Sequence, residues 1–307
     1  MTIRFDGQVI IVTGAGGGLG RAHALEFAKR GGKVVVNDLG GARDGTGGSV
    51  SAAQAVVDEI VAAGGEAIAD GANVTNYEQV EAMVAAAMDK WGRVDVLVNN
   101  AGILRDKTFI KMPISDFQAV VDVHLMGSVN CTKAVWEIMR EQKYGRIMMT
   151  SSSSGLYGNF GQSNYGAAKL GLAGLMNTLH LEGMKYNIHV NTLAPVAATR
   201  MTEDLMAEDV LAALEPALVT PAVIFMCSEQ APSRQIIAAG VGGFARAAIV
   251  ETQGILLDGD EVTAENVAAG WEEASDLSTA RELMQGSEQS VKFLTALAKR
   301  RGIKLER

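Results

Sequence analysis

A serine, a tyrosine and a lysine near the middle of the chain have types and spacings suited to alcohol chemistry. Tyr165 and Lys169 are four residues apart in a segment of helical periodicity, so they share one helix face. Ser152 lies thirteen residues before Tyr165, just after the apolar run 147–150, which predicts a short buried strand. The serine-rich stretch that follows predicts a loop. A hydroxyl, a phenol and an ammonium are therefore expected to meet at one end of a sheet.

These three groups together could remove a proton from an alcohol. A phenol ionises near pH 10 in water, and lowering its pKa to about 7 takes roughly 4 kcal/mol. A neighbouring ammonium in a partly dry site favours the phenolate. Tyr165 could then accept the hydroxyl proton while a hydride leaves the same carbon, and Ser152 could hydrogen-bond the substrate oxygen. Taken alone, Tyr165 and Lys169 would also fit an ordinary surface pair on a helix.

A glycine-rich turn near the N-terminus predicts a dinucleotide site. The apolar run 9–12 predicts a strand buried on both faces, TGAGGGLG occupies 13–20, a helix is expected over 21–30, and a second strand over 33–36 leads to Asp38. Glycines let the backbone approach a pyrophosphate, and a helix N-terminus offers it free N–H groups. This strand–turn–helix context with an acid after the second strand is typical of a Rossmann-type site. The residues expected at the cofactor are Gly14, Gly18, Leu19 and Gly20 in this turn, together with Tyr165 and Lys169.

Asp38 favours NAD over NADP as the cofactor. A carboxylate at this position can accept hydrogen bonds from the adenosine ribose and repels a 2′-phosphate. Arg43 is the nearby cation that keeps NADP open, and it lies in the glycine-rich stretch 40–49, which predicts a loop.

The remaining pattern predicts an α/β protein with a Rossmann-type, doubly wound parallel sheet. Helices and strands alternate, and a long helix over 115–143 is expected to break or kink near Gly127. We expect one domain over 1–244 and a C-terminal extension, 245–307, docked on that core. In the extension, the pattern predicts strands over 245–250 and 254–257 and helices over 263–274 and 287–299.

Charge and cysteine content exclude several classes of partner. The net charge is −8, which argues against nucleic acid and anionic membrane surfaces. The two cysteines give no disulfide framework, and we expect no metal site among the few histidines and cysteines. The first residues carry no signal-peptide pattern, no apolar run is long enough to span a membrane, and the last residues are no peroxisomal address. The expected location is the cytoplasm.

The chain resembles the short-chain dehydrogenase/reductase family. TGAGGGLG, then NNAG at 99–102, then Ser152 with Tyr165 and Lys169 match the family's signatures in order and spacing. The resemblance implies that Asn100, Ala101 and Gly102 pass the cofactor ribose, that Asn73 and Val74 lie beside the adenine, and that Pro195 and Thr199 lie beside the nicotinamide. Asn73 and Val196 depart from the usual Asp and Gly, and residues 200–213 are expected to form a substrate lid.

His124 stands where most family members carry an asparagine that holds a water relaying protons to the active-site lysine. The resemblance therefore makes His124 a candidate catalytic residue, and a hydrogen-bonded core histidine is the alternative.

A narrower resemblance covers nearly the whole chain and weakens after about residue 229. NNAGILRDKTF, the segment around His124, the Tyr165 region and the extended tail are similar to one branch, the (3R)-hydroxyacyl-CoA dehydrogenase domains of peroxisomal multifunctional enzyme type 2 and their bacterial stand-alone relatives. It implies NAD-linked oxidation of a (3R)-3-hydroxyacyl-CoA. A hydroxysteroid or other secondary-alcohol dehydrogenase and a non-catalytic NAD-binding protein remain as alternatives.

Two further expectations concern the surface. Arg105, Lys107 and Lys111 follow the NNAG turn and could receive the phosphates of a CoA arm, or could form a solvated basic loop.

The helix that carries Tyr165 is rich in small residues, which let helices approach closely, and the family pairs this helix across a two-fold axis. A homodimer or homotetramer is therefore expected. The small residues are Gly166, Ala167, Ala168, Gly171, Ala173 and Gly174.

Overall fold

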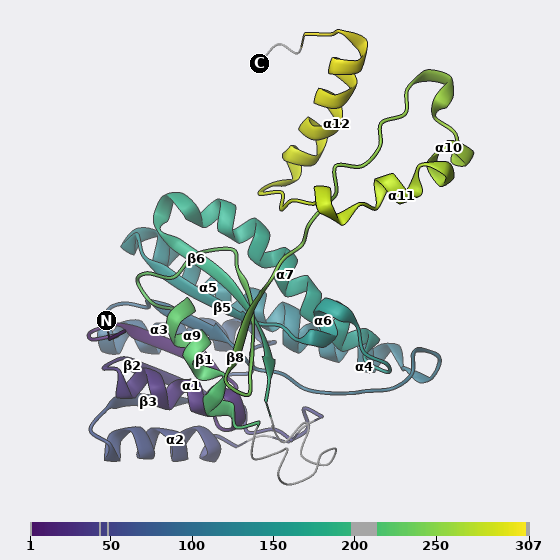
Figure 1. Cartoon of the computed structure of the whole chain (residues 1–307). Coiled ribbons are helices and arrows are strands. Elements are labelled where there is room, and N and C mark those ends of the chain that lie inside the picture. The colour runs from purple at the N-terminus through teal and green to yellow at the C-terminus, as the bar shows by residue number, and fades with distance from the viewer. Residues whose placement is uncertain (1, 43, 48, 198–213, 305–307) are drawn as a thin grey trace. The chain divides into compact units, whose positions relative to one another are not determined.

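Eight strands form one sheet in the order β3-β2-β1-β4-β5-β6-β7-β8, and β1 to β7 are parallel (Figure 1). The computed structural model describes residues 2–42, 44–47, 49–197 and 214–304. The strands are β1 (Val9–Thr13), β2 (Lys33–Asn37), β3 (Glu66–Asp70), β4 (Val96–Asn99), β5 (Gly145–Thr150), β6 (Ile188–Val196), β7 (Ile236–Gly240) and β8 (Gly243–Ala247). The predicted Rossmann-type sheet is confirmed, and its strand order reverses between β1 and β4, where such sheets bind ligands.

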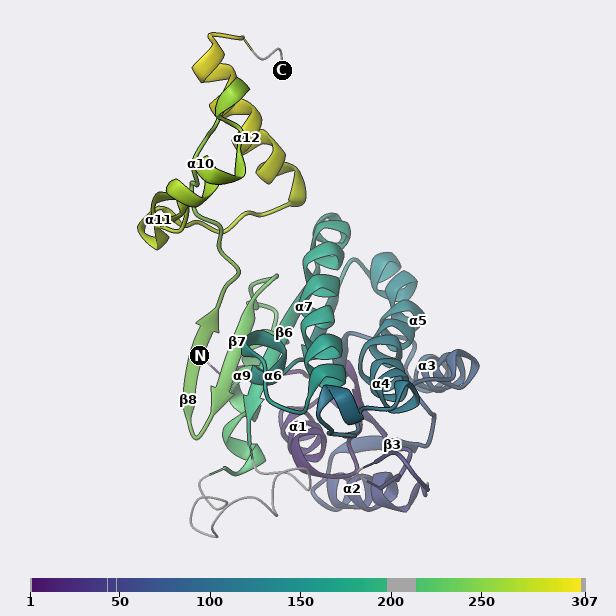
Figure 2. The same cartoon turned by 90° about the vertical axis from the view of Figure 1, so that its right-hand side faces the viewer.

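Helices cover both faces of this sheet (Figure 2). One face carries α1 (Gly18–Lys29), α2 (Ser51–Ala62) and α9 (Thr220–Met226), and the other carries α3 (Tyr77–Trp91), α4 (Ile114–Val121), α5 (Gly127–Gln142) and α7 (Ser163–Gly183). β1 and β5 are buried along their whole length, because neighbouring strands and both helix layers enclose them. In the part of the chain that the structure describes, no helix has the length and apolar character needed to cross a membrane.

The helix expected over 115–143 is broken where the sequence indicated. A π-helical turn, Asp122–Met126, separates α4 from α5 and contains the buried His124. At Gly127 a side chain would place its Cβ 2.7 Å from Cγ2 of Val74. The glycine therefore lets the turn after β3 pack directly on the helix.

Three local predictions differ from the structure. Residues after Thr150 form a short helix, α6 (Ser153–Tyr157), because Ser152 accepts a hydrogen bond from Ser154 N and caps it. The predicted strand 245–250 is instead β8, which a two-residue turn with positive φ at Val241 and Gly242 joins to β7 as a hairpin. Residues 254–257 form no strand.

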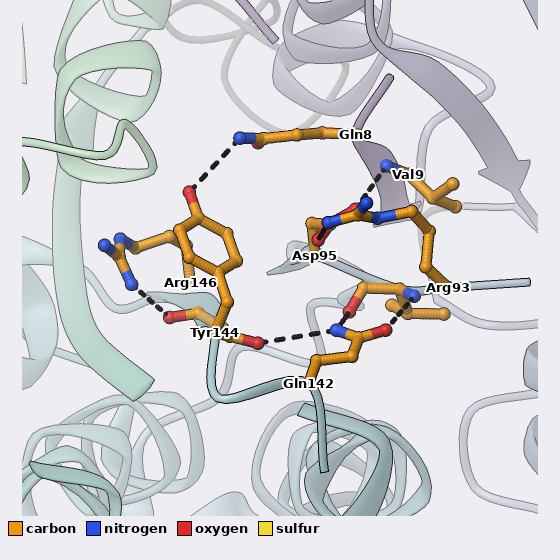
Figure 3. Close-up of polar contacts among 9 residues, drawn as sticks. Gln8, Val9, Arg93, Asp95, Gln142, Tyr144 and Arg146 are labelled. Carbon is orange, nitrogen blue, oxygen red and sulfur yellow. Dashed lines mark hydrogen bonds and ion pairs between the residues drawn. The ribbon is translucent and has the colours of Figure 1, made fainter. Parts of the chain in front are cut away.

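The amino end of the sheet is held by a buried arginine (Figure 3). The Arg146 guanidinium donates to the carbonyl oxygens of Ser228, Gly145 and Asn187 at 2.8–2.9 Å, and it lies 4.3 Å from the Tyr144 ring centroid. It thereby joins β5 to the chain entering β6 and to the end of α9. Carbonyl partners satisfy the donors of this charge without a carboxylate.

Asp95 fixes the neighbouring strands at the same end. Its side chain is fully buried, accepts from Val9 N at 2.9 Å and pairs with Arg93 at 2.7 Å (Figure 3). Gln142, at the end of α5, joins that helix to the segment entering β4, because its side-chain amide accepts from the N–H of Val94 and donates to its C=O. The polar side chains at this end of the sheet thus stabilise the fold, and the candidate site lies at the opposite, carboxyl end.

His23 makes the first unit sensitive to acid. It is fully buried on α1, and its Nδ1 lies 2.9 Å from Thr220 Oγ1 at the start of α9. Burial lowers its pKa from 6.5 to about 3. Below about pH 6.5 the unfolded chain therefore binds a proton that the folded chain does not, so stability falls as the pH falls towards 3.

We expect this histidine to cost about 2 kcal/mol of unfolding free energy between about pH 6.5 and about pH 5. Urea unfolding at both pH values measures this loss. Other titrating groups also contribute to the slope of the unfolding free energy against pH. His23→Gln keeps a hydrogen-bonding side chain without the titration, so its slope should be shallower by that amount. An identical slope in the variant would show that His23 is not the group responsible.

A second compact unit runs from Ala247 to Arg307, after a first unit that ends at Arg246. Its helices are α10 (Ala264–Ala269), α11 (Trp271–Ala274) and α12 (Gly286–Arg301). Lys292 on α12 pairs with Glu251 and donates to Thr252 O at 2.9 Å. Among the residues described for this unit, Lys292 and Ala298 alone are buried. That the extension is docked on the core stays a prediction.

Candidate active site

The glycine-rich turn after β1 brings three backbones into close contact. Gly14 has a left-handed φ of 63°, and a Cβ there would lie 2.8 Å from Cα of Ala101. Gly20 packs behind the turn, since its Cβ would lie 2.2 Å from the carbonyl oxygen of Gly14. α1 starts at Gly18 with no side-chain cap and no acidic residue in its first turn. Its free N–H groups and positive dipole end therefore suit an anion.

A cavity of about 680 Å³ opens beside this turn. Its walls include nine of the residues predicted at the cofactor: Gly14, Gly18, Leu19, Asp38, Asn73, Val74, Asn100, Ala101 and Gly102. Pro195 lies in β6 outside the cavity lining, and Thr199, the lid 200–213 and Arg43 lie outside the described residues. An anion-binding helix end, a carboxylate and a large cleft at the switch point of the sheet fit a dinucleotide.

Other parts of the cavity wall were not predicted. They come from the end of α4 with the π turn, from the loop after β2 and from the segment after NNAG: Ala119, Asp122, Val123, Met126, Leu39, Gly41, Ala42, Gly45, Ile103 and Arg105 are the main ones. No periodicity marks these residues as wall residues, because they belong to separate segments that only the fold brings together.

Asp38 is held in the cavity wall by backbone donors. Its Oδ2 accepts from Gly16 N at 2.8 Å and its Oδ1 from Gly40 N at 2.6 Å. A Cβ at Gly16 would lie 2.8 Å from Oδ2. The carboxylate is thus fixed at the end of β2 and directed along the glycine-rich turn.

The NNAG turn ties β4 to β1. Asn100 donates through Nδ2 to the carbonyl oxygens of Thr13 and Gly14, both at 3.0 Å, and its backbone N–H donates to Thr13 Oγ1. Asn99 is buried and bonds Thr132 of α5 at 3.2 Å. These hydrogen bonds hold the ends of β1 and β4 and the helix α5 together.

Ser152, Tyr165 and Lys169 meet at the carboxyl end of β5. Lys169 is buried and its Nζ donates to the carbonyl oxygen of Thr150 at 2.5 Å. The same Nζ lies 5.4 Å from the centroid of the Tyr165 ring. Ser151 adds a bond from its hydroxyl to Lys169 O at 2.7 Å, which holds α7 against the strand. The three side chains predicted to converge do so.

The electrostatics of this cluster differ from the expectation. Burial raises the pKa of Tyr165 above its usual value, and a hydrogen bond with Ser152 opposes the rise. Burial lowers the pKa of Lys169 from 10.5 to about 7. The chain alone therefore does not lower the phenol's pKa through an ammonium, because desolvation outweighs the attraction. It places instead one readily lost proton on the Tyr165–Lys169 pair near neutral pH.

His124 stands between this cluster and the cavity. Its ring meets the Tyr165 ring edge to face, with centroids 5.1 Å apart. Nε2 lies 2.7 Å from Ile103 O, and within the described chain the buried Nδ1 has no hydrogen-bond partner. A Cβ at Gly102 would lie 2.2 Å from Cε1 of this ring, so the NNAG glycine gives the imidazole its space. Burial, then the nearby Lys169, keeps the pKa of His124 well below 6.5, and the ring is neutral.

Two of the basic residues after NNAG form ion pairs within the protein. Arg105 and Lys107 pair with Asp116 of α4 at 3.2 Å and 2.8 Å. These ion pairs lower the pKa of the Asp116 carboxyl. The sequence predicted either a site for CoA phosphates or a solvated basic loop, and the structure shows Arg105 and Lys107 in ion pairs with Asp116 instead.

Comparison with known proteins gives the family. A model of the short chain dehydrogenase family matches residues 8–209. A short-chain type dehydrogenase/reductase of Mycobacterium tuberculosis is 50% identical over 89% of this chain and 96% of its own length. The peroxisomal multifunctional enzyme type 2 of Drosophila melanogaster is 47% identical over 97% of this chain, which spans half of that enzyme. Its full-length structure superimposes with a TM-score of 0.80.

A solved 7α-hydroxysteroid dehydrogenase complexed with NADH and 7-oxo glycochenodeoxycholic acid is also similar. It is 30% identical over 78% of this chain and 95% of its own, with a TM-score of 0.70. The family match covers well over half of the chain, and the strand order, the glycine-rich turn and the Ser–Tyr–Lys cluster agree with it. The chain belongs to the short-chain dehydrogenase family.

Proposed function

We propose that this chain is an NAD-dependent dehydrogenase that oxidises a (3R)-3-hydroxyacyl-CoA to the 3-oxoacyl-CoA. The observation that carries the proposal is the meeting of Ser152, Tyr165 and Lys169 beside a cavity shaped for a dinucleotide. The substrate class rests on the similarity to peroxisomal multifunctional enzyme type 2 over 97% of the chain.

Tyr165 acts as the base in the proposed reaction. The substrate hydroxyl gives its proton to the Tyr165 oxygen as the hydrogen on the same carbon departs with its electron pair, which leaves a carbonyl. A bound oxidised nicotinamide dinucleotide supplies the hydride acceptor and a positive charge near the phenol. Ser152 holds the substrate oxygen by a hydrogen bond, and Lys169 takes up positive charge as the phenolate forms. His124, neutral and with a free Nδ1, can accept a hydrogen bond from a water that passes the proton onward.

The chain's own residues would hold the cofactor in sequence along the cavity. The N-terminus of α1 would bind the pyrophosphate, Asp38 the adenosine ribose, and Asn73 with Val74 the adenine edge. Asp38 supports NAD over NADP, because its fixed carboxylate repels a 2′-phosphate.

Asp38→Asn tests the choice of cofactor. The variant keeps one acceptor and loses the charge, so we expect kcat/KM with NAD to fall by about 10–100-fold, the scale of one hydrogen bond to a charged group. Activity with NADP should rise relative to NAD. Steady-state kinetics with both cofactors measures the ratio, and the exposed Asp89→Asn on α3 is the control. If NADP is already the better cofactor of the unmodified protein, the assignment to NAD is wrong.

A hydroxysteroid dehydrogenase is the second candidate. The observation in its favour is the similarity to the 7α-hydroxysteroid dehydrogenase solved with NADH. A panel of (3R)- and (3S)-hydroxyacyl-CoAs of several chain lengths and of hydroxysteroids, assayed by NADH formation and compared by kcat/KM, separates the two. Preference for (3R)-hydroxyacyl-CoA supports the first proposal, and preference for a steroid alcohol replaces it with the second.

We also propose that the enzyme is a homodimer or homotetramer that pairs through α7. The structure corrects the surface expected for this contact: Ala168 and Ala173 face the core, Gly166 lies against α6 and Gly171 against Leu125. The solvent-facing side of α7 instead carries Ala167, Leu170, Gly174 and Leu181.

Deleting the residues after Leu277 tests whether the C-terminal unit belongs to the same assembly. The unit leaves Trp271, Leu277, Val291 and Leu294 between 54% and 74% exposed, an apolar surface that a partner subunit would cover. We expect the truncated protein to lose activity or its dimer in light scattering. A dimeric and fully active truncated protein would contradict a role of the tail.

A further inference from the structure

The loop after β2 forms one wall of the cavity. Its described residues, 39–42, 44–47 and 49, fold back on themselves: Ala42 N donates to Thr46 O at 2.7 Å and Ser49 N to Leu39 O at 2.8 Å. Four of them, Leu39, Gly41, Ala42 and Gly45, line the cavity next to Asp38. The loop therefore covers the half of the cavity where the adenosine of a dinucleotide would lie.

Arg105 attaches this loop to the rest of the fold. Its Nε donates to the backbone oxygen of Asp44 at 3.0 Å, and its Nη1 bonds Asp116 of α4 at 3.2 Å. Within the described residues 42 and 44–47, this is the hydrogen bond that joins the tip of the loop to another element. A Cβ built at Gly45 would lie 3.1–3.4 Å from methyl groups of Ile103, so the Ile103 side chain lies beside the loop at this glycine.

The backbone of Arg105 reaches the catalytic helix. Asn164, fully buried, donates from Nδ2 to the Arg105 carbonyl oxygen at 3.0 Å, and its Oδ1 accepts from Tyr165 N at 2.8 Å. The same residue thus contacts the loop over the cavity with its side chain and the start of α7 with its backbone. Replacing the side chain should disturb the first contact and spare the second.

The simpler explanation is that Arg105 only forms a structural ion pair. Lys107 is an example of such a residue. Both cations share Asp116, but among the described residues the Lys107 side chain bonds Asp116 alone, and Lys107 does not line the cavity. The planar guanidinium can serve two partners at fixed angles, which an ammonium does poorly. Lys107 therefore provides a matched comparison that keeps one ion pair to Asp116.

We propose that Arg105 is a positioning residue that latches the loop after β2 over the adenosine half of the dinucleotide cavity. The inference rests on the dinucleotide site of the proposed function and does not depend on the identity of the alcohol substrate. With the latch, the loop is held against Ile103 and the bound adenosine is enclosed. Without it, the tip of the loop loses its bond to the fold and the dinucleotide escapes faster.

Arg105→Met removes the donors and keeps an apolar stem. We expect the dissociation constant of NADH, measured by fluorescence without substrate, to rise about tenfold, in line with the loss of a hydrogen bond from a charged group. Nicotinamide mononucleotide has no adenosine half, so its dissociation constant should stay within about twofold. Amide exchange of the peptide covering residues 39–49 should accelerate. The dissociation constant of NADH for Arg105→Lys should lie between those of Arg105→Met and the unmodified protein.

Lys107→Met is the control, because it removes the other ion pair to Asp116 and leaves both bonds of Arg105 in place. It should bind NADH as the unmodified protein does. Equal weakening in Lys107→Met, or unchanged NADH affinity in folded Arg105→Met, overturns the latch. NADPH is a second probe, so the latch is tested even if the cofactor assignment to NAD fails. Failure of the unmodified protein to bind either dinucleotide overturns both, whereas inactivity on acyl-CoAs overturns the substrate proposal alone.

Discussion

Replacing Tyr165 by phenylalanine should lower kcat for alcohol oxidation by about 10²–10⁴-fold, the contribution of a positioned general base. The change removes one oxygen from a mostly buried side chain and leaves the ring that packs on His124. The hydroxyl of Ser152 and the ammonium of Lys169 remain, but neither can accept the alcohol proton from the same position. Turnover should therefore fall while the site keeps its shape.

Binding and stability measurements separate this effect from misfolding. NADH affinity should change far less than kcat, because phenylalanine keeps the ring and removes only the hydroxyl group. Tyr157→Phe, on α6 with its side chain 75% exposed, is a matched control and should retain full activity. A Tyr165→Phe protein with unimpaired kcat would remove the proposed mechanism.

Lys169→Met should lower kcat to a similar degree and change the pH dependence of the reaction. The methionine stem fits the buried space of the lysine, but it offers neither a charge nor a donor to Thr150. Formation of phenolate on Tyr165 then has no positive neighbour from the chain, while burial still raises the phenol's pKa. The exposed Lys133→Met on α5 serves as the control and should behave as the unmodified protein.

The sign of the pH effect follows from the proton count of the pair. Below the Lys169 pKa of about 7 both groups are protonated and no base is present. Above it one proton has left the pair, and the form with phenolate and ammonium is a tautomer of the form with phenol and amine. For the unmodified enzyme, kcat/KM for oxidation should therefore rise with pH through about 7.

In Lys169→Met the rising limb should move to higher pH, because burial still raises the pKa of the phenol and no lysine shares its proton. Stopped assays of kcat/KM across that range, with denaturation checked separately, measure the limb. A limb that stays near 7 in the variant would mean that another group supplies the base.

Much of the site could be predicted because short-range patterns encode it. The glycine-rich turn needs Gly14 and Gly20, because a Cβ at either position would lie less than 3 Å from a neighbouring backbone atom, so the requirement appears in residue type and spacing. Asp38 ends a strand, and Tyr165 and Lys169 share a helix face. The continuous apolar runs of β1 and β5 identify them as strands buried on both sides. These are properties of neighbouring residues, and the sequence alone determined them.

The tertiary structure decided the pKa values of the site residues, the solvent-exposed side of α7 and the partners of Arg105. The pKa values of Tyr165 and Lys169 depend on how deeply the two side chains are buried, and that burial comes from the packing of β5, α6 and α7. Which small residues of α7 face solvent depends on where α6 and Leu125 lie. Arg105 was indistinguishable from a solvated cation until Asp44 and Asp116 were brought to it from different elements. Local rules state what a residue can do, and long-range packing selects its solvent exposure and partners, from which its pKa and its role follow.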